Sequence, residues 1–295
     1  MKLGIVGHGF VGTAVDHGFT KGVQKFIVDP KHNSNYTIGD LIQFGPDAVF
    51  VAVPTPQLES GECNTEILDD VMQQLNKCKG LLVIVKSTVP SYKLQSIKEQ
   101  CVDLRVVYNP EFLTEKNYID DFRNPPMHVF GGSDADTLKV EDIYHKHSQC
   151  EPCPVFRTDL VTSSMVKYCI NSFLATKVTF MNEMYDVLKA AKGADWQTFT
   201  KIIAHDPRVG KTHMKVPGND GQRGYAGSCF PKDTNALAWF ASAGFSRIRR
   251  PTATVVSAAR TWASGLVAPI TCAFSRASRS TYTLGVSASL GVSSM

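Results

Sequence analysis

A glycine-rich turn near the N-terminus constrains the fold of this chain more than any other feature. Gly7, Gly9 and Gly12 are spaced as G-x-G-x-x-G, between the apolar run at residues 2–7 and an apolar-periodic stretch at residues 10–19. Such a strand, turn and helix let a pyrophosphate approach backbone N–H groups at the positive end of the helix. The same glycines would suit a turn that only packs a helix against a sheet, but the context favours dinucleotide binding. The predicted cofactor contacts are Gly7, Gly9, Phe10, Val11 and Gly12.

An acidic residue closes the next predicted strand. Asp29 follows Gly12 by 17 residues. A carboxylate at that position accepts hydrogen bonds from ribose hydroxyls and repels a 2′-phosphate. The sequence therefore predicts NAD, rather than NADP, as the cofactor.

Strand-like and helix-like segments alternate over the first half of the chain. The predicted strands cover residues 25–28, 48–53, 81–85, 104–107 and 128–130, and the helices between them cover 66–75, 92–101 and 135–145. This alternation predicts an α/β fold, a doubly wound parallel sheet of the Rossmann type. Helical periodicity then runs unbroken over residues 160–191, too long for a crossover helix, and further helices are predicted at 196–204 and 232–243. We expect an NAD-binding domain over residues 1–157 and a smaller all-helical domain over 158–245.

The last fifty residues differ in composition from the rest. Residues 246–295 hold six of the 31 basic residues and no Asp, Glu or Lys, which leaves 25 basic against 27 acidic residues in residues 1–245. The body of the chain therefore has no cationic surplus for binding nucleic acid. The tail, with ten serines, is either a disordered Arg/Ser-rich extension or a segment from a wrong reading frame or gene boundary.

No apolar run approaches the length of a membrane span, and the glycine-broken N-terminus is a poor signal peptide. We expect a cytoplasmic protein with reduced thiols. His145, His147, Cys150 and Cys153 have a spacing that could bind zinc. They fall across a helix end and a domain boundary without a second cluster, so we predict no metal site.

Polar side chains collect where the later strands end. The segments VPTP at 53–56, KSTVP at 86–90 and NPEFLTE at 109–115 follow the third, fourth and fifth strands. Open parallel sheets bind ligands at this edge. Each segment alone reads as an ordinary turn, but three on one edge indicate a site.

Two further patterns suggest chemistry. Lys167 and Asn171 are four residues apart, so they share one face of the long helix. Cys229 follows a glycine at a predicted helix start, where the helix dipole lowers a thiol pKa, and Asp233 lies one turn further on. A solvated Lys–Asn pair and a small buried cysteine are the structural alternatives.

The motifs GIVGHGFVG, VPTP, KSTVP, NPEFLTE, KYCINSFLATKVTFMNE and GSCFPKD, in this order, resemble the UDP-glucose/GDP-mannose dehydrogenase family over residues 1–243. The resemblance implies oxidation of a nucleotide sugar at C6 from alcohol to carboxylate with two NAD. It favours UDP-glucose as the substrate and leaves GDP-mannose and N-acetylated nucleotide sugars open. It also implies Cys229 as nucleophile. A thiolate adds to the intermediate aldehyde, and the resulting thiohemiacetal can be oxidised again to a thioester.

The resemblance also implies roles for other residues. Lys167 and Asn171 would stabilise oxyanions, while Thr88, Glu115 and Asp233 would position water and move protons. Further NAD contacts would be Thr55, Thr88, Glu115 and Lys232. The sugar would contact Glu111, Phe112, Leu113, Glu115, Lys167, Asn171, Gly218, Ala226 and Gly227, the last three on a covering loop at residues 216–227.

The sequence departs from the family at three places. Ala226 stands where a glycine is usual, Ser163 and Ser164 stand where an acidic residue is usual, and residues 246–295 do not resemble the C-terminal nucleotide-binding domain. Two alternatives therefore stay open: a truncated, inactive NAD-binding homologue, and a two-electron dehydrogenase of the hydroxyacid type. We also expect a homodimer formed through the helix at residues 160–191.

Overall fold

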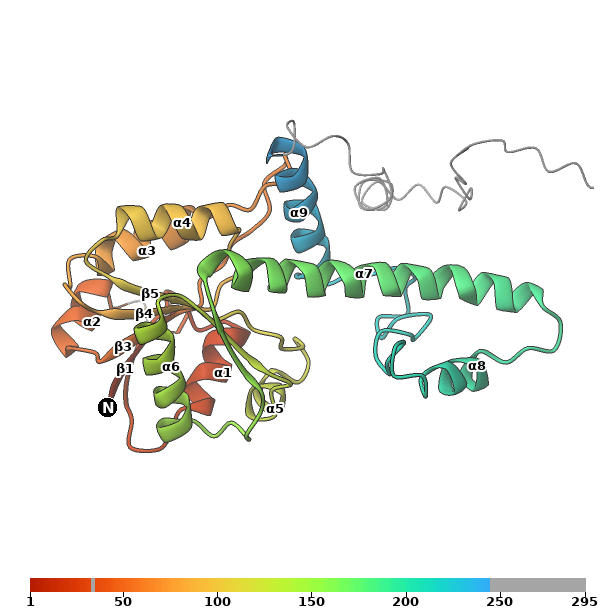
Figure 1. The fold of residues 1–295 in the computed structure, drawn as a ribbon, viewed down its shortest axis with the longest axis horizontal. Coiled ribbons are helices and arrows are strands. Elements are labelled where there is room, and N and C mark those ends of the chain that lie inside the picture. The colour runs from red at the N-terminus through yellow and green to blue at the C-terminus, as the bar shows by residue number, and fades with distance from the viewer. Residues whose placement is uncertain (33–34, 245–295) are drawn as a thin grey trace, which may run out of the picture.

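The structure, a computed structural model, describes residues 1–32 and 35–244, so the predicted tail at 246–295 lies outside the described residues. A Rossmann-type α/β unit is followed by a helical unit built on one long helix (Figure 1). The strands are β1 (Lys2–Val6), β2 (Gln24–Val28), β3 (Ala48–Val51), β4 (Leu82–Val85), β5 (Arg105–Tyr108), β6 (His128–Gly131) and β7 (Val155–Thr158). The helices of the first unit are α1 (Phe10–Gly18), α2 (Ile38–Phe44), α3 (Glu66–Leu75), α4 (Ser91–Gln100), α5 (Tyr118–Arg123) and α6 (Asp134–His147).

The strands form one seven-stranded sheet in the order β2-β1-β3-β4-β5-β6-β7. Strands β1 to β5 are parallel, as predicted, but β6 pairs antiparallel with β5 through Tyr108 and Gly131. The connection between them contains only the six-residue α5 instead of a full crossover helix, so the chain returns in the opposite direction. The expectation of a wholly parallel sheet is therefore wrong at this edge, and β7, which pairs parallel with β6, was not predicted.

Two hydrophobic clusters cover the two faces of the sheet. Along β3, Val49 and Val51 face one cluster, while Ala48 and Phe50 face the other, as the two-residue period of a strand requires. Helices α2, α3 and α4 cover the first face, and α1, α5 and α6 cover the second (Figure 1). This sandwich places all helix-to-strand loops at the two ends of the sheet.

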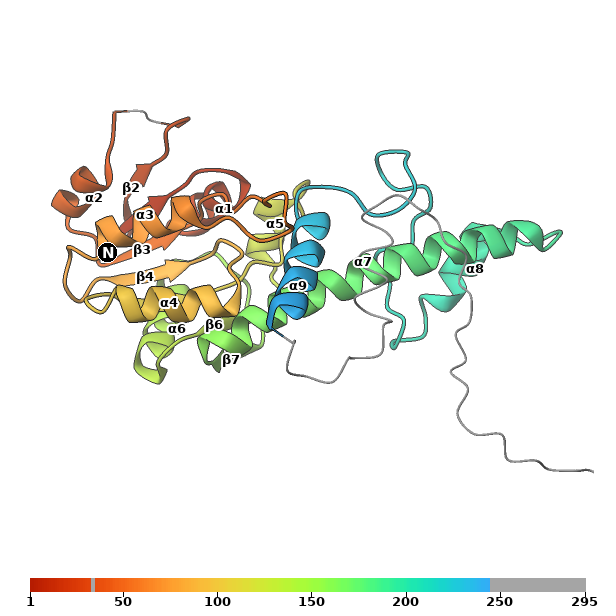
Figure 2. The same cartoon turned by 90° about the horizontal axis from the view of Figure 1, so that it is seen from above.

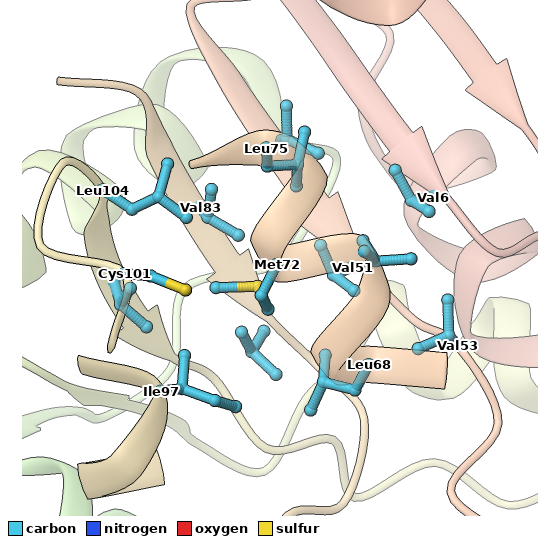
Figure 3. Packing of buried hydrophobic residues seen from close by; sticks show 14 of the residues in the cluster. Val6, Val51, Val53, Leu68, Met72, Leu75, Val83, Ile97, Cys101 and Leu104 are labelled. Atoms are coloured by element: carbon cyan, nitrogen blue, oxygen red, sulfur yellow. The ribbon is translucent and has the colours of Figure 1, made fainter. Parts of the chain in front are cut away.

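Helix α3 shows how sequence spacing builds the core. Leu68, Met72 and Leu75 are four and three residues apart, so they share one face of α3, and they pack toward Val83 of β4 (Figure 3). Leu68 and Leu75 are fully buried, whereas Ile67, next to Leu68 in the sequence but turned away from this face, is 49% exposed.

The helical unit contains α7 (Leu160–Ala190), α8 (Trp196–Ile203) and α9 (Phe230–Gly244). Asp159 caps α7 by accepting a hydrogen bond from the Thr162 N–H at 2.8 Å. The first turns of α7 pack on the sheet unit through the fully buried Ser163 and Ser164, and Ser164 Oγ donates to Val89 O. The helix then leaves the sheet, is crossed by α9 and ends beside α8 (Figure 2). The two serines thus serve packing. No helix among residues 1–32 and 35–244 is long and apolar enough to cross a membrane.

Leu68→Ala tests this core. We expect the substitution to lower the free energy of unfolding by about 2–5 kcal/mol, because it removes a fully buried side chain and leaves a cavity. Ile67→Ala, one residue away on the exposed face of the same helix, should change it by less than about 0.5 kcal/mol. Urea titration followed by circular dichroism measures both values, and equal losses would contradict the packing described here.

Candidate active site

The glycine turn is shaped by close backbone contacts. Gly7 has a φ of +87°, and a Cβ on it would lie 2.5 Å from the Ala52 carbonyl oxygen. A Cβ on Gly12 would lie 1.9 Å from the Gly7 carbonyl oxygen, so both positions require glycine. A Cβ on Gly9, by contrast, would meet no atom within 4 Å. The turn therefore leaves open space at the start of α1, where no described side chain caps the helix, and a pyrophosphate fits this opening.

Asp29 lies beside this turn at the end of β2. Its Oδ2 accepts a hydrogen bond from the His8 N–H at 2.7 Å, and its Oδ1 accepts one from the Lys31 N–H at 2.7 Å. Burial raises the pKa of Asp29, but the backbone donors outweigh burial and hold the pKa below its ordinary value. The carboxylate is therefore ionised at neutral pH and suited to accept hydrogen bonds from a ribose.

A cavity of about 550 Å³ lies at the carboxyl ends of the strands. It opens where the strand order reverses, with β2 on one side of β1 and β3 on the other, which is where doubly wound sheets bind ligands. Its lining comes from the glycine turn, the ends of β3 and β4, Glu111 and the start of α9. The lining residues are Gly9, Phe10, Val11, Ala52, Val53, Pro54, Thr55, Pro56, Gln57, Lys86, Ser87, Thr88, Glu111, Ser228, Cys229, Pro231 and Lys232. Six of the predicted cofactor residues and the predicted nucleophile thus share one cavity, whereas Gly7, Gly12, Asp29 and Glu115 are not among its lining residues.

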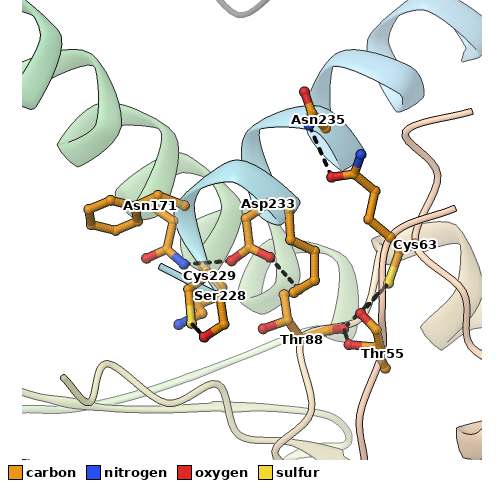
Figure 4. A network of polar contacts seen from close by, with 12 residues as sticks. Thr55, Cys63, Thr88, Asn171, Ser228, Cys229, Asp233 and Asn235 are labelled. Carbon is orange, nitrogen blue, oxygen red and sulfur yellow. Dashed lines mark hydrogen bonds and ion pairs between the residues drawn. The ribbon is translucent and has the colours of Figure 1, made fainter. Parts of the chain in front are cut away.

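The side chain of one threonine in this cavity contacts the main chain of the other. Thr55 Oγ1 donates to the Thr88 carbonyl oxygen at 2.9 Å, and the Cys63 thiol lies 3.8 Å from the same oxygen (Figure 4). These contacts hold the ends of β3 and β4 together.

Lys167 forms a buried ion pair. Its Nζ lies 2.8 Å from Glu111 Oε1 and 2.6 Å from the Glu111 carbonyl oxygen, and both side chains are at most 5% exposed. Burial raises the pKa of Glu111, but Lys167, the Leu113 N–H and Lys86 together outweigh burial and keep the pKa below its ordinary value. Lys167 Nζ also lies 5.5 Å from the centre of the Phe112 ring. The loop after β5 is therefore fixed to α7 at the edge of the cavity.

Asp233 connects α9 with α7. Its fully buried carboxylate accepts from Asn171 Nδ2 at 2.5 Å and pairs with Lys232 Nζ at 2.5 Å (Figure 4). Buried carboxylates require such partners, because an unpaired buried charge is costly. This clamp fixes the start of α9 on α7.

Cys229 is the residue just before α9. Its carbonyl oxygen accepts from the Asp233 N–H at 2.9 Å, and its Sγ lies 3.6 Å from Ser228 Oγ. Burial raises the pKa of the Cys229 thiol above its ordinary value, and the Ser228 hydroxyl opposes this only in part. The sequence-based expectation of a lowered thiol pKa is therefore wrong.

Other predicted site residues lie away from the cavity. Glu115 is exposed in the loop after β5. Gly218 lines a separate cavity of about 680 Å³ beside α8, while Ala226 and Gly227 are exposed in the loop that precedes Cys229. Leu113 lines a small pocket of about 30 Å³ together with Glu111 and Phe112.

Sequence reasoning missed two residues that shape the site. Lys86 is 4% exposed and lines the cavity; its motif KSTVP indicates a site in the sequence, but nothing there gives Lys86 itself a role. Arg223 attaches the glycine-rich loop to α7, with Nη2 2.7 Å from Asp186 Oδ2 and 2.8 Å from the Asn182 carbonyl oxygen. An arginine among glycines carries no signal for this contact, which depends on the path of the loop.

The four-residue His/Cys pattern does not converge in the structure. Cys150 Sγ donates to the Phe122 carbonyl oxygen at 3.1 Å, and His147 Nδ1 lies 2.8 Å from the Lys21 carbonyl oxygen. Within the part of the chain that the structure describes, no three His, Cys, Asp or Glu side chains are grouped to hold a metal ion.

Comparison with known proteins places these features in one family. Residues 34–148 match the model "UDP-glucose/GDP-mannose dehydrogenase family, NAD binding domain", and residues 161–258 match the central domain of the same family. A UDP-glucose 6-dehydrogenase of Rickettsia bellii is 38% identical over 199 residues, 65% of this chain and 44% of that protein. UDP-glucose 6-dehydrogenase TuaD of Bacillus subtilis is 32% identical over 238 residues, 77% of this chain and 50% of that protein. The chain spans about half the length of these relatives.

Solved structures agree with the sequence matches. A UDP-glucose dehydrogenase from Pyrobaculum islandicum superposes with a TM-score of 0.71 at 25% identity, over 90% of this chain and 68% of that one. A GDP-mannose dehydrogenase from Pseudomonas aeruginosa gives 0.57 at 26% identity, over 90% of this chain and 69% of that one. The two family models together match more than half of the residues, in the order in which the two structural units occur. The chain therefore belongs to the UDP-glucose/GDP-mannose dehydrogenase family, and its N-terminal unit is the NAD-binding domain of that family.

Proposed function

We propose that this chain carries the NAD-binding and catalytic parts of a nucleotide-sugar 6-dehydrogenase, and that UDP-glucose is oxidised to UDP-glucuronate. The observation that carries the proposal is the position of Cys229 in the same cavity as the glycine turn and Thr88. A two-electron hydroxyacid dehydrogenase has no use for a thiol at that place. We assign residues 1–157 to the NAD-binding domain and residues 158–245 to the helical domain that contains the thiol.

The residues present fit NAD. Asp29 is an ionised acceptor beside the turn, Gly9 leaves room for a pyrophosphate, and Thr55, Thr88 and Lys232 line the cavity toward Cys229. When bound, NAD supplies the hydride acceptor for each of the two oxidations. The balance is one alcohol, one water and two NAD converted to one carboxylate, two NADH and three protons.

Cys229 supplies the covalent chemistry. Its sulfur forms a bond to C6 of the intermediate aldehyde, while the thiol proton is released and the carbonyl oxygen becomes the oxyanion of a thiohemiacetal. That adduct keeps a C–H bond at C6, so a second oxidation gives a thioester. Water then adds to the thioester, the C–S bond breaks, and the thiol regains a proton. Because burial raises the pKa of Cys229, we expect its proton to leave during attack on the aldehyde.

Polar groups next to the thiol suit the charges that develop. Lys167 and Asn171 lie on one face of α7 and donate hydrogen bonds to Glu111 and Asp233, and both are suited to stabilise an oxyanion on C6. Asp233 and Thr88 are the groups we assign to water and proton movement. Glu115 is not among the residues that line the cavity, whereas Glu111 is. We therefore assign the sugar contact of the loop after β5 to Glu111 before Glu115.

Cys229→Ser tests the covalent step. We expect the variant to lose at least about a thousandfold in NADH formation with UDP-glucose, as is typical when a catalytic nucleophile is removed. NADH absorbance at 340 nm measures the rate. Cys169→Ser, which alters an exposed cysteine on α7, is the matched control and should retain the parental rate. Full turnover by Cys229→Ser would refute the thioester route and favour two-electron chemistry, whereas NAD binding without any parental turnover would favour the inactive homologue.

We further propose a homodimer formed through α7. Phe173, Phe180 and Val187 are 62%, 55% and 61% exposed, and their spacing of seven places them on one side of the helix. A stripe of large exposed apolar side chains is typical of an interface, and a second copy of the chain would cover it.

Phe180→Asp tests the dimer. We expect light scattering to give the mass of two chains for the parent and one chain for the variant, because a carboxylate would be buried unpaired in the interface. Val102→Asp, at an apolar position that is 76% exposed on the NAD-binding unit, is the control and should remain dimeric. A monomeric parent would rule this proposal out.

A further inference from the structure

A buried lysine at the cavity has no role in the chemistry above. Lys86 follows β4 directly and is 4% exposed. It lines the cavity together with Thr88, Glu111 and Cys229. A buried ammonium is unusual, because burial of a charge is costly unless the charge is paired.

The contacts of Lys86 are with neutral groups. Its Nζ donates to Asn109 Oδ1 at 3.0 Å and to the Asn109 carbonyl oxygen at 3.3 Å, and lies 3.4 Å from the Tyr144 hydroxyl. That hydroxyl donates to the same Asn109 Oδ1 at 2.6 Å, and the Phe122 ring centre is 5.8 Å from Nζ. Among the residues that the structure describes, Lys86 forms no ion pair. Its charge is therefore balanced only at longer range.

Titratable groups face Lys86 from several elements. Burial lowers the pKa of His128 in β6 to about 4. Burial raises the pKa of Tyr144 in α6 and the pKa of Cys150, which follows α6. All three side chains are therefore neutral at pH 7. The charged groups that act on Lys86 are Glu111, which follows β5, and Lys167 in α7. Lys86 and Glu111 also line the same two pockets, and Glu111 Oε1 is 2.8 Å from Lys167 Nζ, so the three side chains form a buried cluster of two cations and one anion.

The charge of Lys86 changes the net charge around Lys167. The Glu111 carboxylate is 2.8 Å from Lys167 Nζ, so these two groups alone would present almost no net charge to the cavity. With Lys86 protonated, the cluster has a net charge of +1 at the wall of a cavity that also contains Cys229. A positive potential in a buried site stabilises an anion far more than it would in water.

We propose that Lys86 is a positioning residue that keeps the cluster with Glu111 and Lys167 positively charged, so that Lys167 can stabilise an oxyanion on the substrate. This role rests on the proposed function. Lys86 acts through Glu111: it holds the end of β5 by donating to Asn109, and its charge acts on the Glu111 carboxylate at longer range.

The titration of Lys86 predicts the direction in which activity and stability change with pH. Burial lowers the pKa of Lys86 to about 8, so the cluster loses its net charge as the pH rises through about 8, and activity should fall there. An ordinary lysine has a pKa of about 10.4, so at pH 7 the protonated Lys86 destabilises the folded state. This penalty shrinks as the pH rises from about 8 toward 10. A neutral side chain of similar length should therefore stabilise the protein at pH 7.

Lys86→Met in the full chain separates a role in activity from a role in stability. We expect a Tm at pH 7 that is higher by about 2 °C or more, because an unpaired buried charge has been removed. We expect kcat with UDP-glucose and NAD to fall about tenfold, less than the ~100-fold typical of a donor in direct contact with the oxyanion. The alkaline limb near pH 8 should disappear from the pH profile of kcat. Lys146→Met, at an exposed lysine of α6, is the control and should change none of these values.

Each other outcome overturns the proposal. A Tm and a kcat that fall together would make Lys86 a structural residue, and an unchanged kcat would leave it without a role in the reaction. An alkaline limb retained in Lys86→Met would assign that limb to another group. If the parental chain forms no NADH with UDP-glucose, the proposed function itself fails, while the shift in Tm still measures the cost of the buried charge.

Discussion

The buried clamp on Asp233 is the contact on which the active-site geometry depends. Asn171 and Lys232 satisfy a carboxylate that is completely buried, and Asn171 belongs to α7 while Asp233 belongs to α9. Removing one partner of such a buried charge typically costs about 3–5 kcal/mol. The start of α9, and with it Cys229, is thereby fixed relative to α7.

Helix α7 also fixes the start of α9 relative to the NAD-binding unit, because α7 packs on that unit. Its first turns pack on the sheet unit through Ser163 and Ser164, and Lys167 pairs with Glu111 at the end of β5. One rigid helix therefore positions both the thiol and the polar groups proposed to act on the same carbon atom. The cavity between them is formed by strand ends of one domain and the helix start of another, so its chemistry depends on how α7 is seated.

The electrostatic arrangement is compatible with the nucleophilic role that we propose for the buried Cys229 thiol. Burial keeps the Cys229 pKa above its ordinary value, so the free thiol holds its proton at neutral pH. In the proposed reaction, Lys86 at the cavity wall and Lys167, which is paired with Glu111, would favour the anion that forms when sulfur adds to the carbonyl. The site in this account stabilises the charge that develops during the reaction rather than a free thiolate.

The sequence predicts the fold well because periodicity and caps are local. The glycine turn, the strands that begin the sheet and the 31-residue α7 were all predicted within a few residues. The reversal at β6 was not, because the direction of a strand depends on the connection that precedes it.

For the site, the sequence predicts which strand ends and helix faces meet. The thiol pKa could not be predicted, because it depends on burial by segments that are distant in sequence. The separation of Gly218 from the cavity depends on the path of its loop, and the burial of Lys86 depends on Asn109 and Tyr144 from other elements.

The most direct test of the central claim is the number of NADH molecules formed for each molecule of limiting UDP-glucose. A cysteine-linked thioester route predicts two, because one active site carries out both oxidations before product leaves. A yield of one NADH with release of the aldehyde would contradict this account, since Cys229 would then have no covalent role.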